Sequence, residues 1–75
     1  MLIRYVWAAR DFDGDYEYAF LFTCPPFLDG DRWTCAKGID CFDSIPVRKL
    51  DRLLGIETKA GEVYKLRFVI EKVVE

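Results

Sequence analysis

Apolar and polar residues alternate along the first 24 positions of the chain, on both sides of the dipeptide Asp13-Gly14. Alternation with a period of two is typical of a strand with one buried face. Asp-Gly between two such runs is one of the strongest local signals for a β-hairpin. The pattern therefore predicts two antiparallel strands joined by a two-residue turn.

A two-residue turn at this point fixes which residues of the two strands face one another. Trp7 faces Phe20, and Arg10 faces Glu17 as an ion pair expected to contribute about 0.2–1 kcal/mol. One face collects the aromatic side chains and is the predicted core face: Ile3, Tyr5, Trp7, Tyr18, Phe20, Phe22 and Cys24. The second face mixes charged and small apolar residues: Arg4, Val6, Ala8, Arg10, Glu17, Ala19, Leu21 and Thr23. Either loops or another protein should cover the apolar part of that second face.

The middle of the chain carries the signals for a third strand and one helix. The dipeptide Asp29-Gly30 can turn the chain back into a strand over residues 32–37, after a loose loop that contains two prolines. Leucines and a valine then recur at helical spacing: Val47, Leu50, Leu53 and Leu54. Asp43 or Ser44 can cap this helix, Pro46 suits its first turn, and Gly55 should end it.

The remainder of the chain predicts two further strands, over residues 56–59 and 62–74. Gly61 suits the bulge position of the turn between them. In the long last strand the core face is expected to be Tyr64, Leu66, Phe68, Ile70 and Val74. The expected fold is a single α+β domain over residues 1–75, with its elements in the order β-β-β-α-β-β along the chain. An antiparallel sheet of four to five strands carries one helix packed on one face.

Composition narrows the class of protein. Hydrophobic residues make up 52% of the 75 residues and aromatic residues 16%, which excludes intrinsic disorder. A net charge of −2 argues against nucleic acid as a direct partner, because phosphate binding needs a basic face. The first residues lack the pattern of a secretory leader, and no apolar run is long enough to span a bilayer. We therefore expect a cytoplasmic protein.

Candidate metal and catalytic residues are few. The chain has no histidine, and its three cysteines, Cys24, Cys35 and Cys41, lack zinc-ligand spacing, so buried thiols are expected. Asp11, Asp13 and Asp15 alternate as in a calcium loop, but the glycine falls at the fourth position and the twelfth is Phe22. We expect no metal, no cofactor and no catalytic residues, and calcium binding or enzymatic activity is only a third option.

The carboxylates suggest a surface function. In an up-and-down sheet the first turn and the connection after the third strand emerge at the same edge. That edge would collect the candidate partner-binding residues Asp11, Asp13, Asp15, Glu17, Asp40 and Asp43. Such an acidic edge attracts basic proteins and repels nucleic acid. The alternative is a solvated edge that serves only solubility.

The resulting hypothesis is a small non-enzymatic binding protein or inhibitor. Its acidic surface would bind a basic, nucleic-acid-handling protein. In size and character alone, such a chain is similar to the small inhibitors that phages and mobile elements direct against host defence, anti-CRISPR proteins included. The alternative class is a self-assembling structural module, a homodimer formed through a sheet face or an edge strand.

Overall fold

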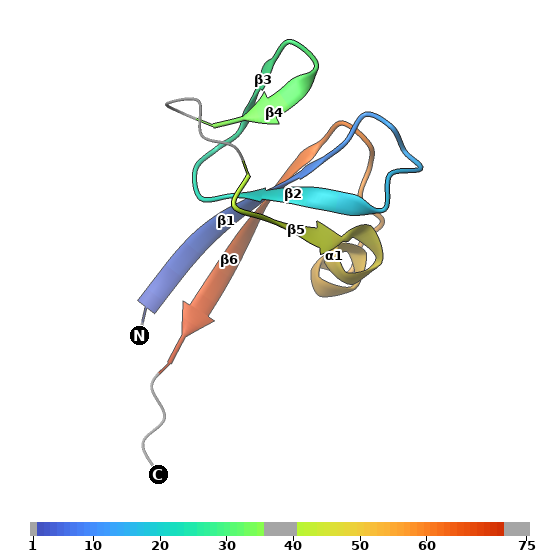
Figure 1. Ribbon diagram of the computed structural model, residues 1–75. Coiled ribbons are helices and arrows are strands. Elements are labelled where there is room, and N and C mark those ends of the chain that lie inside the picture. Colours follow the sequence, from blue (N-terminus) through green and yellow to red (C-terminus); the bar gives the residue numbers. More distant parts are fainter. Residues whose placement is uncertain (1, 36–40, 72–75) are drawn as a thin grey trace.

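The computed structural model describes residues 2–35 and 41–71 and confirms the α+β class (Figure 1). A four-stranded antiparallel sheet has the order β5-β2-β1-β6, and β3 and β4 form a separate two-stranded sheet. The elements in chain order are β1 (Leu2–Arg10), β2 (Tyr18–Phe22), β3 (Phe27–Asp29), β4 (Arg32–Thr34), β5 (Asp43–Pro46), α1 (Val47–Leu54) and β6 (Val63–Ile70).

The central strand β1 has two very different partners. It pairs with β6 along nearly its whole length, from Leu2 opposite Ile70 to Ala9 opposite Val63. It pairs with β2 only through residues 7–10. Residues 2–6 of β1 and 66–70 of β6 therefore form a two-stranded ribbon that extends beyond the rest of the sheet (Figure 1). We call this part the β1–β6 ribbon.

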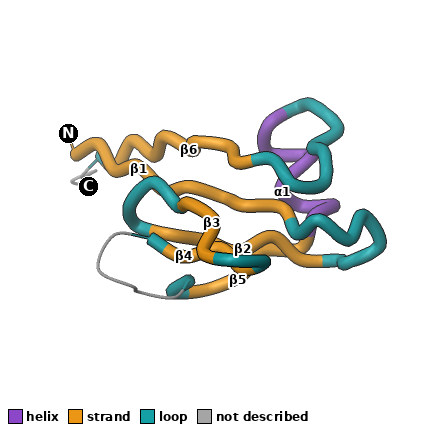
Figure 2. Tube along the Cα trace, turned by 90° about the horizontal axis from the view of Figure 1, so that it is seen from above, coloured by secondary structure: helices purple, strands orange, loops and turns teal. Residues whose placement is uncertain are grey.

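The helix and the small hairpin cover opposite faces of the sheet. α1 buries Leu50 against Ala8 and Ala19, which lie on the face predicted to be the second one, and against Leu66, which was predicted on the core face. The predicted aromatic core face is covered instead by the β3–β4 hairpin, which lies over β2 in the view from above (Figure 2). The two faces of β1 and β2 were sorted correctly, but the assignment of β6 was wrong: its even-numbered residues, predicted to share the aromatic core face, lie on the face of Ala8. The helix lies on this face, because alanines let a helix approach a sheet closely.

The register of the first hairpin differs from the predicted one by two positions. Trp7 pairs with Phe22, and Arg10 pairs with Ala19. The predicted ion pair between Arg10 and Glu17 is therefore wrong. A shift by two positions leaves every side chain on its predicted face, because the side-chain period of a strand is two.

The loop between β1 and β2 explains the shift. The carboxylate of Asp11 accepts a hydrogen bond from the N–H of Asp13 at 2.8 Å, and that of Asp13 accepts one from Asp15 at 2.9 Å. These side chains close local turns of their own, so residues 11–17 form a loop and not a two-residue turn. A type I′ turn would require a positive φ at Gly14, and Gly14 does not have one.

Two turn predictions are confirmed and one strand prediction is wrong. Gly30 has a φ of 68° in the β3–β4 turn, and Gly61 has a φ of 77° in the turn before β6. Residues 56–59 form no strand. The N–H of Thr58 bonds to the carboxylate of Asp51 at 3.0 Å, which removes it from any strand ladder. The predicted residues 36, 37 and 72–74 lie outside the described part of the chain.

The helix begins later than its predicted caps. Asp43 and Ser44 belong to β5, and Pro46 is the residue immediately before the first helical turn, with no side-chain capping bond. The predicted end of the helix is confirmed. Gly55 has a left-handed backbone with a φ of 67°, and its N–H donates to the backbone carbonyl of Asp51 at 2.9 Å.

A buried arginine joins the end of β1 to the segment after the helix. Arg10 is only 5% exposed, and its Nη1 donates to the carbonyl and hydroxyl oxygens of Thr58. The Thr58 hydroxyl in turn donates to the Asp51 carboxylate. This hydroxyl, the Thr58 N–H and nearby Arg10 lower the pKa of Asp51, against the opposing effect of burial. Thr58 thus connects the buried guanidinium of Arg10 to the carboxylate of Asp51.

Candidate binding site

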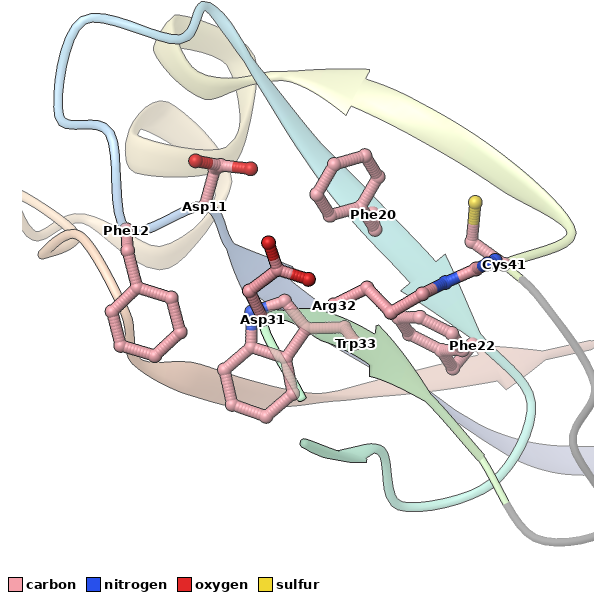
Figure 3. A pocket seen from close by; sticks show the side chains of 8 residues that line it. All are labelled: Asp11, Phe12, Phe20, Phe22, Asp31, Arg32, Trp33 and Cys41. Atoms are coloured by element: carbon pink, nitrogen blue, oxygen red, sulfur yellow. The ribbon is translucent and has the colours of Figure 1, made fainter. Parts of the chain in front are cut away.

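A pocket lies between the aromatic face of the sheet and the β3–β4 hairpin (Figure 3). Its volume is about 290 Å³, near the lower end of the range for ligand pockets and suited to one long side chain. The lining combines four aromatic residues with two carboxylates, one arginine and one cysteine: Asp11, Phe12, Phe20, Phe22, Asp31, Arg32, Trp33 and Cys41. We call it the aromatic pocket.

Trp33 forms one wall of the aromatic pocket and is held in place from two sides. Its indole N–H donates to the carbonyl oxygen of Arg10 at 3.0 Å, which ties β4 to the end of β1. Its ring stacks on Phe12 with centroids 5.9 Å apart and an interplanar angle of 6°. Phe22, 1% exposed, belongs to the buried cluster against which Trp33 packs. A wall with these contacts is formed before any ligand arrives.

Phe12 reaches this position because a glycine lies beneath it. A Cβ atom at Gly61 would lie 2.7 Å from the Phe12 ring, which is closer than real contacts of this kind. The backbone at Asp11 also accepts a hydrogen bond from the Gly61 N–H at 3.0 Å. The loop 11–17 is therefore anchored to the turn before β6, and Phe12, which is 57% exposed, is directed toward Trp33.

Two carboxylates and one guanidinium set the charge of the aromatic pocket. Asp11 and Asp31 come from different loops, yet both line it. Arg32 extends toward Cys41, away from the two carboxylates (Figure 3). The formal charge of the lining is −1, from two acids and one base. The part near Asp11 and Asp31 suits a cation whose apolar stem rests on aromatic rings.

A second hollow extends the acidic surface along the loop 11–17. Its volume is about 390 Å³, and it lies between that loop and the start of α1, with Arg48 on the helix side. Tyr16 belongs to it and stacks on Phe20 with centroids 5.7 Å apart, so the two hollows meet at this pair. The surface around both hollows, which we call the acidic–aromatic surface, comprises Asp11, Phe12, Asp15, Tyr16, Glu17, Tyr18, Phe20 and Asp31.

The predicted acidic edge is only partly assembled. Asp11, Asp13, Asp15 and Glu17 share the loop after β1. Asp43 lies opposite Leu21, three positions along β2 from Tyr18, and so about 10 Å from the start of that strand. The expectation that Asp43 joins the loop carboxylates is therefore wrong, because β5 runs alongside β2 and carries Asp43 to the far end. Asp40 lies outside the described residues.

Asp31 takes the place that was expected for Asp43. In the up-and-down sheet expected from the sequence, in which residues 32–37 form a third strand of the main sheet, Asp31 would lie at the opposite edge. The two-residue turn at Gly30 and Asp31 closes a separate hairpin instead. The short spacing between Pro26 and Gly30, which leaves room for only three strand residues, was the signal that could have indicated this.

The other candidate reactive side chains, among them the thiol of Cys35, have structural roles. A hydrogen bond with Cys24, together with burial, raises the pKa of the Cys35 thiol to about 11. Such a thiol stays protonated at neutral pH and is a poor nucleophile. In residues 2–35 and 41–71, no group of three acidic, cysteine or histidine side chains is placed to hold a metal ion. Nor does that part of the chain contain a helix long and apolar enough to cross a membrane.

No family model, curated protein or solved structure matches the chain.

Proposed function

We propose that this chain is a binding protein that takes a lysine or arginine side chain of a basic protein partner into the aromatic pocket. The observation that carries the proposal is the convergence of Asp11 and Asp31, from separate loops, on a pocket walled by Phe12, Phe20 and Trp33. Carboxylates attract the cationic end of such a side chain, and aromatic rings accept its apolar stem.

The wider acidic–aromatic surface supports the same assignment. Tyr16 and Tyr18 are 42% and 43% exposed, and they lie among Asp15 and Glu17. Exposed tyrosine and tryptophan are the residue types that most often dominate the energy of protein interfaces. Surrounding carboxylates speed the encounter with a basic surface and disfavour acidic ones.

Proteins that handle nucleic acid are the partner class that fits best, because they expose dense lysine and arginine for phosphate contact. A small acidic protein on such a surface competes with the nucleic acid. Inhibition of host defence by a phage or mobile-element protein, of the anti-CRISPR kind, is one biological setting in which this competition is useful. That setting belongs to the proposal and rests on charge and size alone.

The test is binding of a fluorescently labelled peptide rich in lysine and arginine, followed by anisotropy at low and high salt. We expect binding that weakens as salt rises, because the contacting charges are solvent-accessible. Asp11→Asn and Asp31→Asn should each weaken binding about fivefold, since asparagine keeps the carbonyl acceptor but loses the charge.

Asp29→Asn is the matched control for Asp31→Asn. Asp29 is two positions away in the same hairpin and exposed, but it does not line the aromatic pocket. It should leave the affinity nearly unchanged. Equal losses from Asp29→Asn and Asp31→Asn would show that only net charge matters and would contradict a defined pocket.

A further inference from the structure

The β1–β6 ribbon carries a group of exposed apolar side chains, and its role is independent of the function proposed above. Val6 and Leu66 pack in the cluster under the helix, but both faces of the ribbon are exposed over residues 2–5 and 67–70, which lie beyond the residues that pair with β2 (Figure 1). Its large apolar side chains are 43–52% exposed: Leu2, Ile3, Tyr5, Phe68, Val69 and Ile70. Such a patch on a small protein marks an interaction surface.

One long side of the ribbon, the outer side of β6, is an open strand edge. β6 is the last strand in the order β5-β2-β1-β6, and no described strand pairs with its outer side. The N–H of Arg10 bonds to the carbonyl of Glu62 at 2.9 Å, so even-numbered residues of β6 direct their backbone groups toward β1. The odd-numbered residues, Lys65, Arg67 and Val69, thus present their N–H and C=O groups at the outer edge.

We propose that the outer edge of β6 pairs antiparallel with β6 of a second copy of this chain. The two-fold axis lies at Phe68, and the pairing joins two four-stranded sheets into one. In this register Phe68 faces its own copy, Leu66 faces Ile70 of the second copy, and Lys65 faces Glu71. The odd-numbered residues 67 and 69 form a hydrogen-bonded pair, which agrees with the direction of their backbone groups.

Charge complementarity disfavours the registers whose axis lies nearer the start of β6. With the axis at Arg67, the two copies of that arginine would lie opposite each other. With the axis at Leu66, Lys65 would face Arg67, which again opposes like charges. With the axis at Phe68, Glu71 of one copy lies opposite Lys65 and diagonally beside Arg67 of the other. The Lys65 ammonium lies 4.3 Å from the Tyr5 ring centroid, which keeps it on this face of the ribbon.

A groove beside β6 provides the place for the partner's side chain. It has a volume of about 180 Å³ between the last turn of α1 and β6, and its apolar lining is Leu53, Leu54, Leu66 and Phe68. Leu53 is 59% exposed. Ile70 of the second copy, opposite Leu66, lies on this same face of the sheet and covers the groove. The dimer thus buries apolar side chains of β6 together with those near the end of the helix.

Sedimentation velocity over about a hundredfold range of concentration tests the association, because a dimer is governed by mass action. The wild-type chain should change from monomer to dimer as the concentration rises. Glu71→Lys and Lys65→Glu should each weaken the dimer about tenfold, since each places like charges opposite one another twice. Mixing these two variants should restore a one-to-one dimer, because every pair across the axis is then complementary.

Lys49→Glu and Glu57→Lys are the matched charge controls, since both residues are exposed, lie in α1 and the following loop, and do not line the groove beside β6. They should leave the dimer unchanged, and circular dichroism should show native folds for all four variants. A wild-type chain that stays monomeric over the whole range would overturn the proposal. A dimer that withstands both β6 variants, or a mixture that does not re-associate, would overturn this register.

Discussion

One nitrogen of Arg10, Nη1, donates two hydrogen bonds to Thr58, 48 positions later in the chain, at 2.7 Å to its carbonyl and 2.9 Å to its hydroxyl oxygen. Because Thr58 also bonds to Asp51, a single threonine links the end of β1 to the helix. The carbonyl of Arg10 holds the Trp33 indole. The buried arginine therefore supports both the core and the wall of the aromatic pocket.

Replacement of Thr58 by valine should lower the free energy of unfolding by about 1–3 kcal/mol. Valine has the same shape, but it leaves Arg10 and Asp51 without the hydroxyl that joins them, and unsatisfied buried groups are costly. Urea unfolding measures the change. Thr23→Val at an exposed position is the matched control and should be nearly neutral. Equal effects at the two sites would show that the linkage does not stabilise the fold.

Acid should weaken the protein through Asp51. The folded pKa of Asp51 lies below its ordinary value of 3.8, so the folded state favours the carboxylate. The corresponding stability is fully present above the unfolded pKa and is lost as the pH falls through the folded pKa. The difference in unfolding free energy between wild type and Asp51→Asn should therefore shrink as the pH falls below about 4. A difference that is constant from pH 6 to pH 2 would contradict this role.

Gly61 and Gly30 should differ in their tolerance of alanine. Both have positive φ, so alanine costs about 1–2 kcal/mol of backbone strain at either position. Only at Gly61 does the added Cβ meet the Phe12 ring, whereas nothing lies within 4 Å at Gly30. Gly61→Ala should therefore be the more destabilising, and it should change the near-ultraviolet circular dichroism as Phe12 moves off Trp33.

A double-variant cycle separates strain from the steric clash at Gly61. In a Phe12→Ala background the clash is absent, so Gly61→Ala should cost about as much as Gly30→Ala. If the excess cost of Gly61→Ala persists without the Phe12 ring, the close approach to that ring is not its cause.

Alkaline pH should weaken the protein through Cys35. Its folded pKa is raised from 9.0 to about 11, so the folded state favours the neutral thiol. The stability that this provides is present below pH 9 and is lost as the pH rises toward 11. Unfolding of wild type and Cys35→Ala, compared between pH 8 and pH 11, isolates this contribution from that of Tyr64, whose pKa is also raised. Parallel profiles for the two proteins would refute it.

The sequence pattern predicted which residues share a face because that information is local. Alternation in β1 and β2 placed Trp7, Phe20 and Phe22 together, and the structure confirms it. The pattern could not predict the register, because Asp11 and Asp13 use their side chains to close the loop. Nor could it predict that Arg10 is buried, since that depends on Thr58 and Asp51, which are remote in sequence.

The sequence pattern indicated only some of the residues that line the candidate site. The carboxylates of the loop 11–17 were expected at a surface, and they are there. The convergence of Asp11 with Asp31 depends on the β3–β4 hairpin folding over the sheet as a separate unit, which alternation in so short a segment cannot show. Phe20 and Phe22, which line the pocket, were expected to be core residues because an aromatic side chain gives the same pattern in a core and in a pocket.

The pairing of β1 with β6 has a consequence for how the chain folds. Ala9 pairs with Val63 and Leu2 with Ile70, so the paired residues are 54 and 68 positions apart. Contacts between such distant positions slow folding, because most of the chain must be closed into a loop before they form. During synthesis, the side of β1 that pairs with β6 stays unpaired until β6 has left the ribosome. Until then its apolar residues are open to chaperones or to other chains.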